Sequence, residues 1–191
     1  MTRPRVDGRK ARGERRRAEI VEATLRVIER DGVAGVTHRT VAAEAGVPTT
    51  STTYHFATLD DLLSGALVWS AEQCASEVYW MIDRARTKGS RGVNELAELL
   101  ADWLGPRRRR AIAEYELYLL AARRPELRPA ARRWLDVLTS MVRQPGDESG
   151  VQLRTYLAGV DGLLMQGLID DEPPTAEQLR PVVRFMFRDL G

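Results

Sequence analysis

Residues Thr37 to Leu63 read THRTVAAEAGVPTTSTTYHFATLDDLL, and this segment is the most informative part of the sequence. Thr37 suits the N-cap of a first short helix, because its hydroxyl can accept from free backbone N–H groups of the first turn. Gly46 suits the left-handed residue that ends this helix. Pro48 suits the first position of a second helix, where its missing N–H costs nothing. Two short helices over 37–45 and 48–55, joined by a tight glycine turn, are typical of a helix-turn-helix.

The second short helix is rich in hydroxyl side chains and ends in Tyr54-His55-Phe56. Small hydroxyl groups contact phosphates and base edges, and a threonine methyl can pack on a thymine methyl. Phe56 is predicted to be core. Directly after it, Thr58 and Asp61 form a pattern similar to a capping box, which predicts the start of a long third helix.

The segment from Ile20 to Leu67 resembles the N-terminal DNA-binding domain of the tetracycline-repressor (TetR) family of bacterial regulators. The resemblance is carried by Thr37, Arg39, Val41-Ala42, Ala45-Gly46-Val47, Tyr54-His55-Phe56, Thr58 and Leu62-Leu63. Beyond this segment it is a similarity of helix number and length. Three positions depart from the family. Thr50 replaces a common glycine, Thr53 a common aromatic residue, and Leu59 a phosphate-binding lysine.

Composition is that of a soluble globular protein, with 43% hydrophobic and 29% charged residues in a chain of 191. The chain has no run of 18 or more apolar residues, so we expect no membrane span. The basic N-terminus lacks the apolar segment of a secretory signal. The single cysteine, Cys74, excludes an internal disulfide and a cysteine-based zinc site. We therefore expect a cytoplasmic protein that needs no cofactor and no metal.

Positive charge is concentrated at the N-terminus, where residues 1–17 carry eight basic and two acidic side chains. Residues 1–12 are unpatterned and are predicted to be a basic, disordered arm. A solvated tail would explain this charge equally well in isolation. Beside a helix-turn-helix, however, it favours contact with the phosphates of double-stranded DNA.

Apolar residues at helical spacing predict an all-α protein of about nine helices, without strand alternation. Besides the two short helices, the predicted helices cover about 14–30, 58–88, 93–104, 107–122, 127–142, 151–169 and 175–190. QPGDESG at 144–150 is the clearest loop. We expect an N-terminal three-helix DNA-binding domain at 13–57, and a C-terminal helical ligand-binding and dimerisation domain at 58–191.

The predicted DNA-contacting residues lie on the two short helices. Arg39 is the candidate for base readout, because an arginine can reach the O6 and N7 atoms of guanine. A solvated surface arginine is the alternative, and a solvated histidine is the alternative for His55. The full set is Thr37, His38, Arg39, Pro48, Thr49, Thr50, Ser51, Thr53, Tyr54 and His55.

Two further sets belong to the second domain. The resemblance implies a small-molecule cavity between helices, for which the candidate walls are Trp80, Trp103, Tyr115, Tyr118, Trp134 and Met165. It also implies a homodimer, for which the candidate interface is Leu157, Val160, Asp161, Leu164, Leu168, Val182, Val183 and Met186. Ordinary packing inside the monomer is the alternative for both sets.

The sequence favours a regulator over an enzyme. Both histidines, His38 and His55, lie in the DNA-binding segment, and no nucleotide-binding glycine motif or metal-ligand cluster appears. The leading hypothesis is a repressor that binds a palindromic operator as a dimer and is released by a small apolar molecule. A DNA-binding regulator or architectural protein without a ligand is the alternative. The tract Arg107–Arg110 stays open between steering DNA, pairing with acidic residues and simple solvation.

Overall fold

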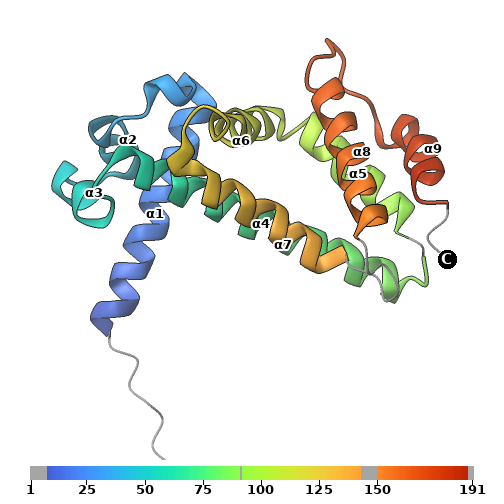
Figure 1. Cartoon of the computed structure of the whole chain (residues 1–191), viewed down its shortest axis with the longest axis horizontal. Helices are drawn as coiled ribbons and strands as arrows, with labels where there is room; N and C mark the ends of the chain where they lie inside the picture. The colour runs from blue at the N-terminus through green and yellow to red at the C-terminus, as the bar shows by residue number, and fades with distance from the viewer. Residues whose placement is uncertain (1–7, 91, 143–149, 189–191) are drawn as a thin grey trace, which may run out of the picture. The chain divides into compact units, whose positions relative to one another are not determined.

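The computed structural model describes residues 8–90, 92–142 and 150–188. Among these residues, all regular secondary structure is helical (Figure 1). The all-α prediction is confirmed, with nine α-helices in the described part of the chain. They are α1 (Gly8–Asp31), α2 (His38–Ala45), α3 (Thr49–His55), α4 (Leu59–Thr87), α5 (Val93–Leu104), α6 (Arg108–Leu120), α7 (Arg128–Val142), α8 (Val151–Gly167) and α9 (Ala176–Met186). Two short 3₁₀ turns, η1 (Val33–Gly35) and η2 (Pro125–Leu127), precede α2 and α7.

The chain forms two compact units. One comprises residues 1–70 together with 113–131, and the other comprises residues 71–112 together with 132–191. Helices α4, α6 and α7 therefore each contribute residues to both units. The boundary expected at 57/58 divides the predicted DNA-binding domain from the predicted ligand-binding domain, and it does not coincide with the division between the two compact units. This functional boundary stays a prediction.

The first unit is built around the apolar face of α1. The predicted positions Ile20, Ala23, Val27 and Ile28 are all buried, as are Phe56 and the inner face of α4. Helix α2 packs on α1, and α3 packs on α2 (Figure 1). The two short helices are therefore held in place by packing on the longer helix α1, directly for α2 and through α2 for α3.

Helix α1 begins at Gly8, whereas the sequence predicted a disordered arm up to residue 12. Side-chain pairs one turn apart accompany the extra turns: Lys10 lies 4.0 Å from Glu14, and Arg16 lies 2.9 Å from Glu19. Such pairs stabilise exposed helices modestly. The sequence reading missed them because residues 8–12 have no apolar periodicity. The rest of the predicted arm, residues 1–7, lies outside the described residues.

The second unit has α5 at its centre, with α8 and α9 both packed against it. Gly167 of α8 permits a close approach, because a Cβ at this position would lie 2.7 Å from Cδ1 of Leu104. Thr175 caps α9 as predicted, since its hydroxyl accepts from the backbone N–H of Gln178. Most of the predicted loop at 144–150 lies outside the described residues.

Two members of the arginine tract have partners in the second unit. Arg107 pairs with Glu77 and Asp102, at 2.5 Å each. Arg108 donates to the backbone carbonyls of Leu168 and Asp170, at 2.7 and 2.8 Å. The carbonyls at a helix C-terminus lack intrahelical partners. Arg108 therefore satisfies the end of α8, and simple solvation does not describe these two arginines.

Replacing Arg108 with methionine is expected to lower the free energy of unfolding by about 1–2 kcal/mol, since hydrogen bonds from a charged donor are lost. Urea denaturation measures this change. Arg109→Met is the matched control, because Arg109 is exposed. Equal losses in the two variants would show that the contacts of Arg108 with α8 do not stabilise the fold.

Candidate nucleic-acid interface and ligand cavity

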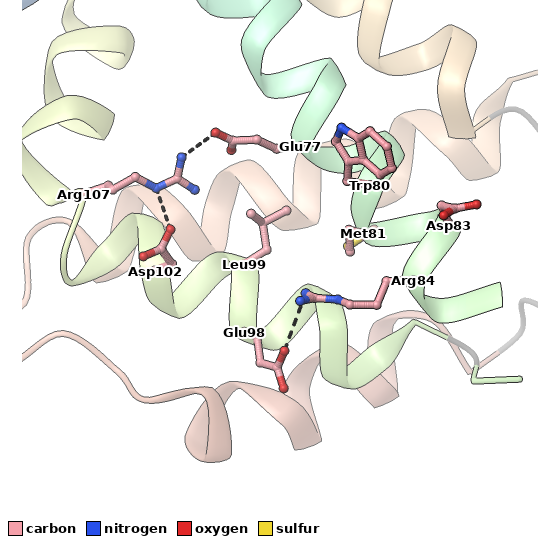
Figure 2. Close-up of a pocket in the computed structure, with 9 residues that line it drawn as sticks. All are labelled: Glu77, Trp80, Met81, Asp83, Arg84, Glu98, Leu99, Asp102 and Arg107. Carbon is pink, nitrogen blue, oxygen red and sulfur yellow. Dashed lines mark hydrogen bonds and ion pairs between the residues drawn. The ribbon is translucent and has the colours of Figure 1, made fainter. Parts of the chain in front are cut away.

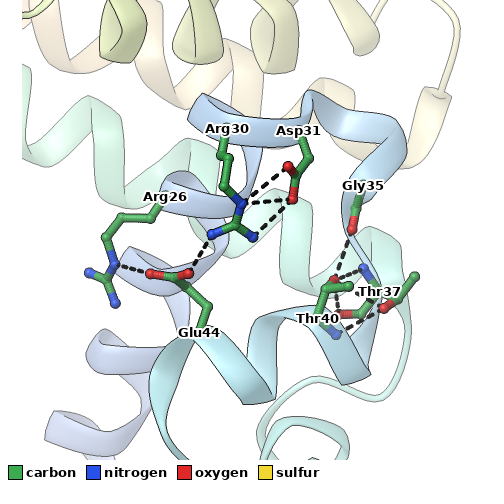
Figure 3. A network of polar contacts seen from close by, with 7 residues as sticks. All are labelled: Arg26, Arg30, Asp31, Gly35, Thr37, Thr40 and Glu44. Atoms are coloured by element: carbon green, nitrogen blue, oxygen red, sulfur yellow. Dashed lines mark hydrogen bonds and ion pairs between the residues drawn. The ribbon is translucent and has the colours of Figure 1, made fainter.

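Local chemistry fixes the ends of α2. The Thr37 hydroxyl accepts from the backbone N–H of Thr40 at 3.0 Å, and the Thr40 hydroxyl accepts from the backbone N–H of Thr37 at 2.9 Å (Figure 3). Gly46 ends the helix with φ 65° and ψ 35°, which is the left-handed conformation predicted for it. Pro48 was predicted to be the first residue of the second short helix. In the structure it is the N-cap of α3, which begins one residue later at Thr49.

An ionic clamp holds α2 against α1. Glu44 accepts hydrogen bonds from Arg26 at 2.8 Å and from Arg30 at 2.7 Å (Figure 3). Arg30 also pairs with its neighbour Asp31 at 2.9 Å. The hydrogen bonds from Arg26 and then Arg30 hold the pKa of the Glu44 carboxyl below its ordinary value. These ion pairs therefore stabilise the ionised carboxylate and join α2 to α1.

Glu44→Gln should lower the free energy of unfolding at pH 7 by about 0.5–1 kcal/mol, the range of partly exposed ion pairs. The pKa is lowered in the folded state, so the contribution is complete above the ordinary value of 4.5 and is lost as the pH falls below it. Denaturation curves of variant and parent should thus converge in acid. Glu22→Gln, at an exposed position of α1, is the control. A difference that persists in acid would contradict the clamp.

The outer face of α3 is an exposed hydroxyl-rich surface. Pro48, Thr49, Thr50, Thr53 and Tyr54 are exposed, and Tyr54 is the most open of them at 84%. From the predicted set, Thr37 and Arg39 are also exposed, whereas His38, Ser51 and His55 are half-buried. The side chain of Arg39 forms no hydrogen bond or ion pair with the described part of the chain, so its guanidinium is free to meet a ligand.

Thr52 differs from its hydroxyl neighbours, because it is completely buried. Its hydroxyl lies 2.8 Å from the carbonyl of Thr49 and 3.3 Å from that of His38, the first residue of α2. It therefore joins α3 to α2. This role was not predictable from the sequence, since a run of five serine and threonine residues does not show which one points inward.

A positive edge lies beside the C-terminal end of α3. Arg17 of α1 lies 4.7 Å above the Phe56 ring. Burial, followed by the charges of Arg17 and Arg16, lowers the pKa of His55 below its ordinary value. An anion at this edge would relieve the repulsion among these groups. Helix α1 thus adds arginines to the face that α3 presents.

The second unit contains a cavity of about 720 Å³ between α4 and α5 (Figure 2). Four carboxylates and two guanidinium groups line it, so its charge is negative overall. Arg84 lies 3.6 Å from Glu98, and Arg107 binds two of the other carboxylates. The lining residues are Glu77, Trp80, Met81, Asp83, Arg84, Glu98, Leu99, Asp102 and Arg107.

Only part of the predicted ligand set meets at this cavity. Trp80 lines it and is 64% exposed, and the indole N–H of Trp103 donates to Glu77 at 3.0 Å. Trp134 and Met165 do not line it. Tyr115 and Tyr118 belong to residues 113–131, which are part of the first unit. Sequence reasoning missed the carboxylates, because an acidic residue on a helix looks the same whether it faces a cavity or solvent.

A stripe of mostly exposed residues runs along one face of α8, and we call this stripe the seam. The residues of the seam recur at alternating spacings of four and three, which is the spacing of coiled-coil contacts. Met165 is 45% and Ile169 82% exposed, and a Cβ at Gly162 would meet nothing within 4 Å. On α9, Val182 and Phe185 are exposed as well. The seam consists of Val151, Thr155, Ala158, Gly162 and Met165 on α8, together with Ile169 in the turn that follows the helix.

Two of the residues predicted for the dimer interface face inward. Leu164 and Val183 are buried within the chain, so they contribute to the core of the second unit. Val182 is exposed, and the remaining five are half-buried: Leu157, Val160, Asp161, Leu168 and Met186. Leu164 and Val183 are therefore core residues of the single chain, and the assignment of the other six to an interface stays a prediction.

Among residues 8–90, 92–142 and 150–188, no helix is long and apolar enough to cross a membrane. The same residues contain no group of three or more histidine, cysteine or acidic side chains that would hold a metal ion.

Known proteins resemble both halves of the chain. Residues 20–66 match the family model described as bacterial regulatory proteins, tetR family. Residues 90–189 match the model described as tetracyclin repressor-like, C-terminal domain. The chain is 25% identical over 185 residues to the HTH-type transcriptional regulator PksA of Bacillus subtilis, covering 89% of this chain and 87% of PksA.

Solved structures are similar over most of the chain. Multidrug binding protein EbrR, complexed with ethidium, is 42% identical with a TM-score of 0.74, covering 90% of this chain and 98% of EbrR. EbrR is also known in complexes with proflavin and malachite green. A TetR-family member from Streptomyces coelicolor A3 is 40% identical with a TM-score of 0.73, covering 90% of this chain and 97% of its own.

Proposed function

The chain belongs to the TetR family of bacterial transcriptional regulators, and from this premise we propose that it is a repressor released from DNA by planar aromatic cations. It binds a palindromic operator as a homodimer, and the cation enters the cavity between α4 and α5. The observation that carries the DNA-binding part is the exposed hydroxyl face of α3, with the unpaired guanidinium of Arg39 beside it on α2.

The seam on α8, together with Val182 and Phe185 of α9, supports the dimer. A second copy would cover these apolar side chains, which lie in water on the single chain. Alternating spacings of four and three suit an antiparallel or parallel pairing of two α8 helices. A two-fold axis then presents two α3 helices to successive major grooves, about 34–36 Å apart or a multiple of that distance.

The charge of the cavity refines the expected effector from an apolar molecule to an aromatic cation. The carboxylates would balance the charge of a positive ligand. The exposed indole face of Trp80 would attract both the aromatic ring and the positive charge of such a ligand. The complexes of EbrR with ethidium, proflavin and malachite green agree with this chemistry.

Arg107 suggests how the cation acts. Its guanidinium already binds Glu77 and Asp102, and it directly precedes α6. A cation that takes over these carboxylates displaces Arg107 and shifts the start of α6. The response on DNA is no larger than the difference in the cation's affinity for the two states of the protein.

Release from DNA tests the proposal. Ethidium titrated into a protein–duplex complex should weaken DNA binding by about 5–150-fold, the usual range of coupling. Glu77→Gln should abolish most of this response, whereas Glu72→Gln, an exposed position of α4, should retain it. Intercalation of the dye into the duplex releases all three proteins alike, so the difference between variants reports the cavity. Equal responses would leave a DNA-binding protein without this effector site.

A further inference from the structure

The turn between α6 and α7 carries a cluster of exposed arginines in the same compact unit as the helix-turn-helix. Arg123, Arg124 and Arg128 are all exposed, and Glu126 is the only acidic residue among residues 121–128. Arg128 donates to the carbonyls of Ala121 and Ala122 at 3.4 Å each, which helps to hold the turn in shape.

An ion pair places this turn beside the DNA-binding helices. Nη1 of Arg124 lies 2.8 Å from Oδ1 of Asp60, which is the second residue of α4. Only residues 56–58 separate the end of α3 from the start of α4. The arginines of the turn therefore lie next to the segment that leaves the recognition helix.

The start of α4 has no basic side chain of its own. Leu59 is apolar and exposed, and Asp60 and Asp61 would repel a phosphate. Asp61 accepts from the backbone N–H of Thr58 at 3.0 Å, so it belongs to the cap of α4. Arg124 neutralises Asp60, so the positive charge near the start of α4 comes from the turn between α6 and α7.

The contribution of Arg123 and Arg124 to the stability of the fold does not explain why two exposed arginines lie in this turn. A partly exposed ion pair such as Arg124 with Asp60 contributes little to the stability of the fold. The side chain of Arg123 forms no ion pair or hydrogen bond within the described part of the chain. Arginine matches phosphate oxygens in a bidentate geometry, and Arg124 keeps further N–H donors beyond the one that binds Asp60.

We propose that Arg123 and Arg124 form a second phosphate-binding surface, which contacts the DNA backbone next to the groove that α3 enters. This inference rests on the proposed DNA-binding function and extends it to an element outside the helix-turn-helix. The ligand is the phosphate backbone of duplex DNA, so the contact adds affinity and salt dependence at every sequence.

Salt dependence on a fixed operator duplex tests the surface. Each lost phosphate contact lowers the slope of log affinity against log salt concentration by about one. Arg123→Gln and Arg124→Gln should each show this loss, and the double variant should lose about two. Arg133→Gln, an exposed position further along α7, removes the same charge and should leave the slope nearly unchanged.

Asp60→Asn separates a phosphate contact from mere neutralisation of Asp60. If Arg124 binds phosphate, Arg124→Gln still lowers the slope when Asp60 is already asparagine. If Arg124 only neutralises Asp60, the substitution has no effect in that background, and its role as a contact is overturned. A parent protein that binds no duplex would instead overturn the proposed function, whereas normal binding with unchanged slopes overturns only this surface.

Discussion

Met165→Glu is expected to turn the dimer into monomers and to weaken operator binding by about 100-fold or more, because an unpaired charge buried in an interface costs several kcal/mol. Met165 is the last member of the seam that lies within α8, and it is 45% exposed on the single chain. The isolated chain therefore tolerates a carboxylate there, and only association with a second copy would bury it. Two linked α3 helices bind far more tightly than one, so a monomer loses most of its affinity.

Light scattering gives the oligomeric state, and fluorescence anisotropy gives the affinity for the operator. Gln166→Glu is the matched control, because Gln166 is the exposed neighbour of Met165 on α8 and lies outside the seam. Leu164 is unsuitable for this test, since it is buried at 3% exposure and a charge there would disrupt the fold. A Met165→Glu dimer with normal affinity would place the interface elsewhere.

Arg39→Ala should weaken binding to the preferred operator by about 1–3 kcal/mol, the usual cost of removing a bidentate base contact. The effect should fall on particular base pairs, because a guanine with two acceptors is what a guanidinium distinguishes. Affinity for random duplexes should change little. The fold should be unaffected, since Arg39 is exposed and pairs with nothing in the described chain.

Arg16→Ala is the comparison for Arg39. It removes a positive charge from α1 without a base contact, so it should weaken all duplexes alike and flatten the salt dependence. If Arg39→Ala behaves in the same way as Arg16→Ala, then Arg39 contacts phosphate and base readout belongs to α3 alone.

Local features of the helix-turn-helix were predictable from the sequence, because each depends on residues close in the chain. The capping pair of Thr37 and Thr40 spans three residues, and the left-handed Gly46 needs only its own lack of a side chain. Thr58 and Asp61 likewise form the expected reciprocal cap, with both hydrogen bonds at 3.0 Å. Apolar periodicity also placed every long helix of the described chain, although α1 begins earlier than predicted.

The features that sequence reasoning missed join residues far apart in the chain. Glu44 meets Arg26 across 18 residues, Arg107 meets Glu77 across 30, and Arg108 meets Leu168 across 60. An arginine in a sequence looks the same whether it is solvated, capping a helix or lining a cavity. The burial of Leu164 within its own chain was not predictable for a related reason, because two faces of α8 are apolar and only the packing on α5 shows which is inward.

Selection of bound duplexes from a random pool shows whether two exposed α3 helices read one duplex as a symmetric pair. A symmetric pair should select an inverted repeat whose half-sites are centred about 10–10.5 base pairs apart or a multiple of that spacing, as one helical turn requires. An enriched motif without internal symmetry, or a pool with no enrichment at low ionic strength, would contradict it.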